Sequence, residues 1–441
     1  MFVFDGSVLE GKTVVVFEKV MYEGKTVFVH ADLTDEEQSV HIPKIGTTAR
    51  DQNGTRMSLA AEMIQIIDTV SYENLIPDME YLLEGVVIDK QTGETLAGME
   101  PVSTSFIPET ASGTVEVAFD LVGAGLAGKT LVIFEKLYLN DQEIASHEDL
   151  NDEGQTIHVP EVRTTASDVK TGTHTALAEE KVQIRDMVQY RNLIPGKEYT
   201  VIGTLMDKET GDMLMVDGDY VMASVTFTAD QPDGEIEMLF ELNGSALEGK
   251  TIVVFEDIFF EYKQVASHAD LSDEEQSIHF PQVRTMATVN GQKRVNVSVG
   301  LITITDTVSF KNLIPGVEYT LQARLIDKQT GKPALLDGKE ITADVTFIPD
   351  QPDGTVSVQL QVNAEDYPDH DLVVFETLIQ TDIQKVIGRH EDLNDADQTI
   401  HVTKHPNTGD STNVGCWIAV LMISFGFLAW CIYQERKMRL K

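Results

Sequence analysis

One segment recurs four times along the chain and limits its possible folds more than any other feature. Its copies read VHADLTDEEQSVHIP, SHEDLNDEGQTIHVP, SHADLSDEEQSIHFP and RHEDLNDADQTIHVT, and each keeps a histidine eight positions before a glutamine. The four glutamines are separated by 117, 121 and 122 residues: Gln38, Gln155, Gln276 and Gln398. A period of this length indicates a tandem array whose repeats are each long enough to bury a core.

The repeats divide the chain into one partial module, three complete modules and a C-terminal segment. Their predicted bounds are residues 1–44, 45–162, 163–283, 284–404 and 405–441. Short β-branched runs alternate with turn signals such as Asn-Leu-Ile-Pro at 74–77, 192–195 and 312–315. This pattern predicts all-β modules of the immunoglobulin-like, Greek-key sandwich type. Because the junctions are short, we expect a semi-rigid rod.

The two ends of the chain carry different signals. The C-terminal segment has 19 uncharged, mostly apolar residues at 415–433, followed by the basic tail QERKMRLK. This predicts a transmembrane helix with a cytoplasmic tail, and it places the modules outside the cell. At the N-terminus the sequence begins inside a repeat without a visible signal peptide. We therefore expect the chain to be the C-terminal part of a longer protein.

Composition narrows the expected partners and cofactors. The formal net charge is −39, with 72 acidic and 33 basic residues, so nucleic acid is not an expected partner. Acidic clusters such as the one at Asp149 and Asp152 lack the glycine and distal glutamate of a calcium-binding hand loop, and we predict no metal and no cofactor. Both cysteines, Cys416 and Cys431, lie in the apolar run, so no module contains a disulfide.

Alignment of the three complete modules shows which polar residues they keep. Each has a threonine at its opening, an aspartate some twenty residues later, a glutamate after Val-Phe or Ile-Phe, and the histidine and glutamine of the repeated segment. The sets are Thr47, Asp68, Glu135, His147 and Gln155; Thr164, Asp186, Glu256, His268 and Gln276; and Thr285, Asp306, Glu376, His390 and Gln398. The acidic residues between the histidine and the glutamine are predicted to form a variable surface turn.

Strand periodicity predicts where the threonine and the glutamine point. Gln155 shares a strand face with two apolar residues at alternate positions after it, and Thr164 lies between Val162 and Ala166 on one face. Both side chains are therefore expected to be buried, where they need hydrogen-bond partners. Since the terminal strands of many Greek-key sandwiches are neighbours, each side chain could satisfy the other.

The five residues are also the parts that an acyl transfer needs. A threonine hydroxyl is a weak nucleophile that requires a base, for which histidine suits neutral pH. The amide oxygen requires a proton donor, and two carboxyl groups forced together in a low dielectric leave one of them protonated. Alternatively, the five residues form an ordinary buried polar network in which no bond is made.

Two further sets of polar residues recur without such chemistry. The aspartates of the Asp-Lys-x-Thr-Gly segments are predicted to be hairpin turn residues: Asp89, Asp207 and Asp327. The histidines three positions after each glutamine are predicted to be surface or interface residues near the module junctions: His41, His158, His279 and His401.

In their order and spacing these motifs resemble the threonine-glutamine ester-bond domains of Gram-positive surface adhesins, also called VaFE repeats after the strand that here reads VVVFE, LVIFE, IVVFE and LVVFE. The resemblance covers residues 1 to about 404. It implies intramolecular esters, each formed with release of one ammonia, between Thr47 and Gln155, Thr164 and Gln276, and Thr285 and Gln398. It also implies that His147, His268 and His390 assist as bases while the aspartate and glutamate of each module polarise and stabilise the reacting groups. The sequence departs from the pattern at Gly46, where arginine is usual, and at Met286, which follows Thr285.

The C-terminal segment resembles the sorting signal of Gram-positive wall-anchored proteins, with His405 where leucine is usual. The resemblance implies a sortase that cleaves between Thr408 and Gly409 and joins Thr408 to an amine of peptidoglycan or of a pilin. A plain single-span anchor is the alternative.

Together these features predict a cell-wall-anchored stalk or adhesin shaft, and not a turnover enzyme, because each module would react once with itself. Two other functions stay open: a pilin-like shaft with Lys-Asn isopeptide bonds, and a ligand-binding array without cross-links. A host ligand would be bound through the N-terminal part that precedes this chain.

Overall fold

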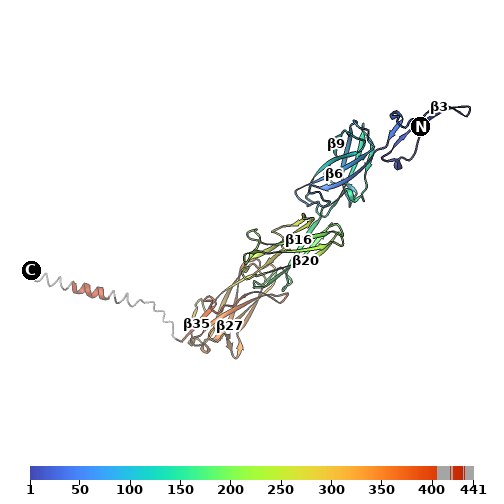
Figure 1. The fold of residues 1–441 in the computed structure, drawn as a ribbon. Helices are drawn as coiled ribbons and strands as arrows, with labels where there is room; N and C mark the ends of the chain where they lie inside the picture. The colour runs from blue at the N-terminus through green and yellow to red at the C-terminus, as the bar shows by residue number, and fades with distance from the viewer. Residues whose placement is uncertain (405–417, 419–420, 431, 433–441) are drawn as a thin grey trace, which may run out of the picture. The chain divides into compact units, whose positions relative to one another are not determined.

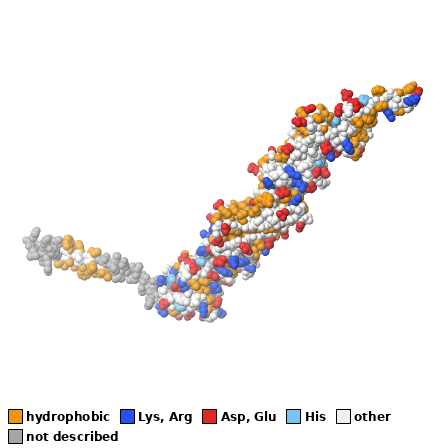
Figure 2. All heavy atoms as spheres, viewed as in Figure 1, with side chains coloured by type: hydrophobic (Ala, Val, Ile, Leu, Met, Phe, Trp, Pro, Cys, Tyr) orange, Lys and Arg blue, Asp and Glu red, His pale blue; other side chains and the backbone are white. Residues whose placement is uncertain are grey.

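The computed structural model of the chain describes residues 1–404, 418, 421–430 and 432. The chain forms two compact units, Met1–Pro281 and Gln282–Lys441. The modules are β-sandwiches built almost entirely of strands, so the prediction of tandem all-β modules is confirmed (Figure 1). Acidic side chains are scattered over the visible face of the modules (Figure 2).

The second complete module shows the architecture of a single sandwich. Its strands are β14 Glu161–Asp168, β15 Val182–Arg191, β16 Glu198–Asp207, β17 Met215–Val216, β18 Asp219–Tyr220, β19 Met222–Thr228, β20 Gly234–Leu242, β21 Thr251–Phe260, β22 Lys263–His268 and β23 Ser277–His279. One sheet has the order β14-β15-β20, and the facing sheet has the order β19-β16-β21-β22 with β23 also paired to β21. The first strand, β14, and the last strand, β23, therefore belong to different sheets.

The core of this module lies between the two sheets. Along β15 and β20, alternate residues such as Val188 and Phe240 are at most 1 % exposed, and they pack with Val201 and Val254 from the facing sheet. This alternation follows from the period of two along a strand, which sends successive side chains to opposite faces.

The first complete module repeats this arrangement within the same unit. Its elements are β5 Lys44–Asp51, β6 Met63–Glu73, β7 Tyr81–Asp89, β8 Glu94–Thr95, β9 Val102–Phe106, β10 Gly113–Val122, β11 Thr130–Leu139, β12 Gln142–His147, the 3₁₀ turn η3 Glu153–Gln155 and β13 Thr156–His158. One sheet has the order β10-β6-β5, and the other has β12-β11-β7-β8 with β13 paired to β11 and β9 to β7.

The third complete module makes up the described sandwich of the second unit. Its elements are β24 Gln282–Thr288, β25 Arg294–Asn296, η4 Val297–Val299, β26 Leu301–Lys311, β27 Tyr319–Asp327, β28 Lys332–Pro333, β29 Leu335–Leu336, β30 Lys339–Glu340, β31 Thr342–Phe347, β32 Gly354–Asn363, η5 Ala364–Asp366, β33 Asp371–Gln380, β34 Lys385–His390 and β35 Thr399–Thr403. Its three-stranded sheet is β24-β26-β32, and β25 adds to the facing sheet by a parallel pairing with β35.

The partial module contains only the last elements of this pattern. They are η1 Ser7–Leu9, β1 Thr13–Val15, β2 Glu18–Tyr22, β3 Lys25–His30, η2 Glu36–Gln38 and β4 Ser39–His41. Every residue of β2 and β3 is exposed. The register nevertheless matches that of the complete modules, since Glu18 lies opposite His30 as Glu135 lies opposite His147.

Part of the C-terminal segment is described. Residues 421–430 are helical. Within the described part of the chain, no helix is both long and apolar enough to cross a membrane. The predicted sortase motif, including His405, Thr408 and Gly409, and the basic tail lie outside the described residues.

Candidate functional site

The five recurrent residues of the second complete module meet at one edge of its sandwich. Thr164 lies on the edge strand β14, Asp186 on the neighbouring strand β15, and Glu256 on β21 of the facing sheet. His268 ends β22 directly opposite Glu256, and Gln276 immediately precedes β23. The inward orientation predicted from strand periodicity is confirmed, because Thr164 is 5 % exposed and Gln276 is fully buried.

In this module the threonine hydroxyl and the glutamine amide each donate a hydrogen bond to a different carboxyl group. The Thr164 hydroxyl donates to Asp186 Oδ1, and Gln276 Nε2 donates to Glu256 Oε2 at 2.6 Å. The expectation that the threonine and the glutamine satisfy each other is therefore wrong for this geometry. The two carboxyl groups come from different sheets, Asp186 from the sheet of β14 and Glu256 from the sheet of β23.

A backbone hydrogen bond holds the two terminal segments of the module together at the site. The amide of Ala166, two residues after Thr164, donates to the carbonyl of Glu275 at 2.8 Å. Glu275 directly precedes Gln276. The main chain thus brings the threonine and the glutamine to the same place although 112 residues separate them in the sequence.

Burial keeps part of the carboxyl pair protonated. Desolvation raises the pKa of Glu256 well above its ordinary value, and the nearby charge of Asp186 raises it further. Desolvation also raises the pKa of Asp186, while hydrogen bonds from Thr164 and Glu256 partly oppose that shift. Because two like charges cannot both be sustained in this buried site, the glutamate is the member that keeps its proton at neutral pH.

An aspartate orients the histidine in every copy. The distance from His268 Nε2 to Asp273 Oδ2 is 3.2 Å, and the same pair recurs as His147 with Asp152 at 3.1 Å and His390 with Asp395 at 3.0 Å. With Nε2 donating to the carboxylate, Nδ1 is the nitrogen left to accept a proton.

Sequence reasoning missed this aspartate by assigning the segment to a variable surface turn. The signal was present, because an aspartate stands five positions after the histidine in all four copies: Asp35, Asp152, Asp273 and Asp395. It has two roles. In the second module Asp273 Oδ1 also accepts a hydrogen bond from the amide of Glu275 at 2.9 Å, which shapes the turn before Gln276.

The third module repeats the arrangement in the second unit. The Thr285 hydroxyl donates to Asp306 Oδ1, and Gln398 Nε2 donates to Glu376 Oε2 at 2.7 Å. Burial, followed by the neighbouring Asp306, raises the pKa of Glu376 to about 11. Met286 is half exposed and points away from this network, so its replacement of the usual threonine leaves the site unchanged.

The first module differs in the position of its amide. Gln155 Nε2 donates to the carbonyl oxygens of Ile133 at 2.6 Å and of His147 at 3.1 Å, and not to Glu135. Desolvation nevertheless raises the pKa of Glu135 to about 9 and that of Asp68 to about 6.

The histidine of the first module faces the threonine strand. The backbone amide of Thr47 donates to His147 Nδ1 at 3.2 Å. This contact directs Nδ1 at the main chain of the first strand and occupies its lone pair, so Nδ1 must leave the Thr47 amide before it can accept a proton. The predicted residues are thus brought together in all three modules, but in the first module neither the Thr47 hydroxyl nor the Gln155 amide is hydrogen-bonded to the carboxyl pair.

A small residue lies opposite each glutamate in the strand register, and in the first module it makes room for the carboxyl group. Gly85 pairs with Glu135 in the strand register, and a Cβ atom on Gly85 would lie 2.5 Å from Glu135 Oε1. The corresponding positions hold Gly203 opposite Glu256 and Ala323 opposite Glu376. Sequence comparison of the modules could have found this position, since all three residues are small.

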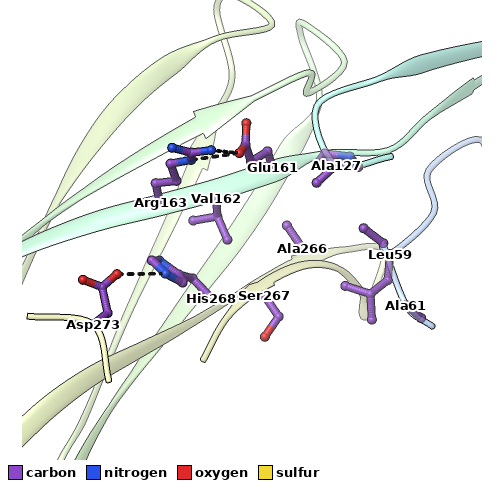
Figure 3. A pocket seen from close by; sticks show the side chains of 12 residues that line it. Leu59, Ala61, Ala127, Glu161, Val162, Arg163, Ala266, Ser267, His268 and Asp273 are labelled. Atoms are coloured by element: carbon purple, nitrogen blue, oxygen red, sulfur yellow. Dashed lines mark hydrogen bonds and ion pairs between the residues drawn. The ribbon is translucent and has the colours of Figure 1, made fainter. Parts of the chain in front are cut away.

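An open hollow reaches the histidine side of the second module's site. It has a volume of about 500 Å³ and is lined by Val162, Arg163, His268 and Asp273, together with Leu59 and Ala127 of the first module. Figure 3 shows the His268 ring turned toward Asp273 at one end of this hollow. The histidine therefore borders solvent, whereas the carboxyl pair is buried.

The recurrent turn aspartates play the structural part that was predicted for them. Asp89 Oδ1 accepts a hydrogen bond from the amide of Gln91 at 3.0 Å, and Asp89 Oδ2 pairs with Lys129 at 2.7 Å. These contacts tie the hairpin after β7 to the start of β11 and lie outside the five-residue site.

Fold and site together define a class of protein: a tandem array of β-sandwiches, each with a buried threonine and glutamine beside a carboxyl pair and a histidine. The chain matches the T-Q ester bond containing domain at residues 1–42, 43–159, 160–280 and 281–402. It belongs to this family.

Comparisons with solved structures are distant. A bacterial adhesin from Mobiluncus mulieris containing intramolecular disulfide, isopeptide and ester bond cross-links is 15% identical, with 49% of this chain and 80% of that chain covered and a TM-score of 0.25. A 1.5-MDa bacterial ice-binding adhesin is 10% identical, with 82% and 98% covered and a TM-score of 0.22. A search of curated proteins found no match.

Proposed function

We propose that each complete module cross-links itself through an ester between its threonine and its glutamine, and that the chain is the shaft of a surface adhesin. One observation carries the cross-linking proposal. In the second and third modules the threonine hydroxyl and the glutamine amide lie on the two members of a carboxyl pair whose glutamate has a raised pKa. Membership of the T-Q ester bond containing domain family supports it.

The reaction begins at the threonine. In the second module Asp186 accepts the hydroxyl hydrogen bond and increases the electron density on Thr164 Oγ1. Oγ1 attacks Cδ of Gln276 as the hydroxyl hydrogen turns from Asp186 to His268, which takes the proton and whose Nε2 is held by Asp273. The proposed bond joins Oγ1 to Cδ.

The glutamate stabilises the charge that develops on the amide oxygen. A protonated Glu256 can donate to that oxygen once the Gln276 amide turns over in its plane, which exchanges its oxygen and nitrogen positions. In a dry site such a donor is worth far more than in water. The Cδ–Nε2 bond then breaks, the nitrogen takes the proton from His268, and ammonia leaves. The products are one ester, one ammonia and the histidine in its starting state.

An ester at this position would protect the module against force. It would join the first strand to the last, so that tension along the chain would cross the link without unravelling the strands between. No module has a cysteine, so a disulfide cannot supply this protection. A shaft exposed to flow needs such a link, and this is the function that we assign to it.

We further propose that the C-terminal segment anchors the shaft to a Gram-positive cell wall. The support is the order of the sequence, in which the Pro406-Asn407-Thr408-Gly409 motif, an apolar run and a basic tail follow the last module. In this proposal a sortase cleaves after Thr408 and transfers it to an amine of peptidoglycan or of a pilin. Thr408→Ala in the producing cell should then move the protein from the wall fraction to the membrane fraction. An unchanged wall fraction would contradict the anchor.

Intact mass tests the esters directly. The full chain should be lighter than its sequence by three ammonia molecules, one for each complete module. Thr164→Ala should restore one of them, and peptide mapping should assign the change to the second module. Thr165→Ala is the matched control, because that hydroxyl is exposed on the same strand and should leave the mass deficit intact. A full-length mass equal to the sequence would refute the proposal.

Alkaline hydroxylamine separates esters from Lys-Asn isopeptide bonds, which also lose ammonia. It should cleave all three links and leave a hydroxamate on the former glutamine. Links that survive hydroxylamine would instead indicate the isopeptide alternative.

A further inference from the structure

The junction between the first and second complete modules contains one buried asparagine that belongs to one module and bonds to the other. Asn192 follows β15 of the second module, has a φ of 62°, and is 9 % exposed. A left-handed backbone is uncommon for residues other than glycine, but asparagine adopts it more readily than most. This conformation turns the side chain away from its own module.

The side chain of Asn192 fills its hydrogen-bonding capacity with groups of the first module. Its Nδ2 donates to the carbonyl oxygens of Lys129 at 2.6 Å and Val159 at 3.2 Å. Its Oδ1 accepts from the Thr130 hydroxyl at 2.7 Å and lies 3.0 Å from His158 Nδ1. An amide side chain has two donor hydrogens and two lone pairs, so none of them is left over.

The second module holds the asparagine loop rigidly in place. The amide of Asn192 donates to Asp233 Oδ1 at 3.0 Å, and Leu193 is fully buried in the module's core. The amide of Ile194 donates to the Tyr199 hydroxyl at 2.8 Å. From the other side, Met57 of the first module is 1 % exposed, and its sulfur lies 3.3 Å from the same hydroxyl.

Three of these four asparagine side-chain contacts recur where the partial module meets the first complete module. Asn74 has a φ of 61°, and its Nδ2 donates to the carbonyl of Ile42 at 3.2 Å. Its Oδ1 accepts from the Thr13 hydroxyl at 2.9 Å and lies 3.2 Å from His41 Nδ1. Because this geometry recurs at both junctions of the unit, it is a regular part of how these modules are joined.

The sequence of the last module breaks the pattern. A threonine lies opposite the histidine in the three preceding copies: Thr13 with His41, Thr130 with His158 and Thr251 with His279. In the last copy Asp371 takes the place of the threonine, and its Oδ1 lies 2.6 Å from His401 Nδ1. The sequence has three Asn-Leu-Ile-Pro segments, one after each threonine-containing copy and none after Asp371.

We propose that the threonine and histidine at the end of a T-Q module form a recognition site for the asparagine of a following module, and that aspartate in place of the threonine closes this site. The hydroxyl and the imidazole N–H both donate to the amide oxygen, whereas a carboxylate accepts the imidazole hydrogen bond and repels that oxygen. The partner is thus another module of the same family with an Asn-Leu-Ile-Pro loop. The pair of residues decides which modules can be joined in series.

Distance distributions between spin labels test this recognition. The full chain, with Cys416→Ser and Cys431→Ser, would carry labels at Ala124→Cys in the first module and Glu235→Cys in the second. Asn192→Gly keeps the left-handed backbone accessible but removes the side chain. It should make the distribution between the two modules at least twice as wide. A second pair of labels within the second module should keep its distribution, which shows that the sandwich is intact.

Three further variants make the test specific. Asn140→Gly, at an exposed left-handed hairpin position, is the matched control and should leave the width unchanged. Thr130→Asp installs the residue of the last module and should broaden the distribution as Asn192→Gly does. If Asn192→Gly disturbs the second module itself, Asn192→Asp replaces it, since it keeps the shape but removes both donors. A width that stays constant in Thr130→Asp and in the Asn192 variants would overturn the proposal, as would equal broadening by Asn140→Gly.

Discussion

At the scale of single residues, the aspartate five positions after the histidine links structure and chemistry most closely. In the second module Asp273 uses one oxygen to cap the turn that leads to Gln276 and the other to hold His268 Nε2. A side chain with both roles fixes the position of the electrophile and the tautomer of the base together. The neighbouring residues of the turn are exposed and vary between the copies, so the sequence alone does not draw attention to this aspartate.

The substitution Asp273→Asn tests the orienting role. Asparagine can still cap the turn through its oxygen, but it no longer holds the Nε2 hydrogen through a charge. We expect esterification of the second module to slow by about 10²-fold or more, the usual contribution of a positioned base. The fraction of chains that have lost all three ammonia molecules, followed by intact mass after purification, measures this. Asp270→Asn, in the same surface turn, changes a side chain that accepts hydrogen bonds from Ser272; it is the control and should behave as the wild type.

The buried carboxyl pair predicts a pH dependence for a module that lacks its ester. In Thr47→Ala, burial should still raise the pKa of Glu135 to about 9 in the folded state, from 4.5. Above pH 4.5 the unfolded state loses this proton while the folded state keeps it, so stability is greatest below 4.5 and falls as the pH rises toward 9.

Thr47→Ala should therefore unfold in its first module at a lower temperature at pH 8 than at pH 5. The difference in unfolding free energy should be on the order of a few kcal/mol, since each unit of pKa shift corresponds to about 1.4 kcal/mol. Scanning calorimetry at the two pH values measures it. Adding Glu135→Gln should remove most of the difference, and a first-module transition that does not move with pH would contradict the raised pKa.

At the scale of strands, register decides which residues can react. Glu256 lies directly opposite His268 on β22 and opposite Gly203 on β16, so one position of β21 pairs with both the base and a residue that has no side chain. Periodicity alone predicted that the threonine and the glutamine point inward. It could not show that β14 and β23 lie in opposite sheets, because the pairing of distant strands depends on how the whole sandwich closes.

Gly85→Val tests the space opposite the glutamate. The new side chain would meet Glu135 Oε1 and Phe119 Cζ, each 2.5 Å from the position of Cβ. We expect overpacking to cost about 1–3 kcal/mol and to displace the carboxyl group, so that the first module keeps its ammonia while the others lose theirs. Peptide mapping by mass measures this. Gly46→Arg, which restores the residue found in the other modules, should leave the first ester unaffected; a normal ester in Gly85→Val would show that the space is not needed.

At the scale of the whole molecule, an ester in each module would add stability where disulfides are absent. A link between Thr164 and Gln276 closes a loop of 112 residues, for which the chain-entropy estimate is about 4–5 kcal/mol. The same type of link in all three modules would give the array a uniform resistance to unfolding. No large core or metal would be needed for it.

Thr164→Ala should consequently lower the unfolding temperature of one module and leave the others unchanged. For a sandwich of this size the expected shift is roughly 15 to 20 °C. Scanning calorimetry of the full chain, compared with Thr165→Ala, would resolve the transition that moves. Superimposable traces for the two variants would mean that the link adds no stability.

The sequence by itself determined the array, the all-β class of its modules and the set of five residues, because repeated copies expose the positions that do not vary. It also determined the inward orientation of the threonine and the glutamine, which follows from the period of a strand. Only the tertiary structure decided the rest. The separation of β14 and β23 into two sheets places the hydroxyl on one carboxyl group and the amide on the other, and burial of that pair keeps the glutamate protonated. These outcomes depend on contacts between segments more than 100 residues apart and on the exclusion of water, and neither is encoded in a local pattern.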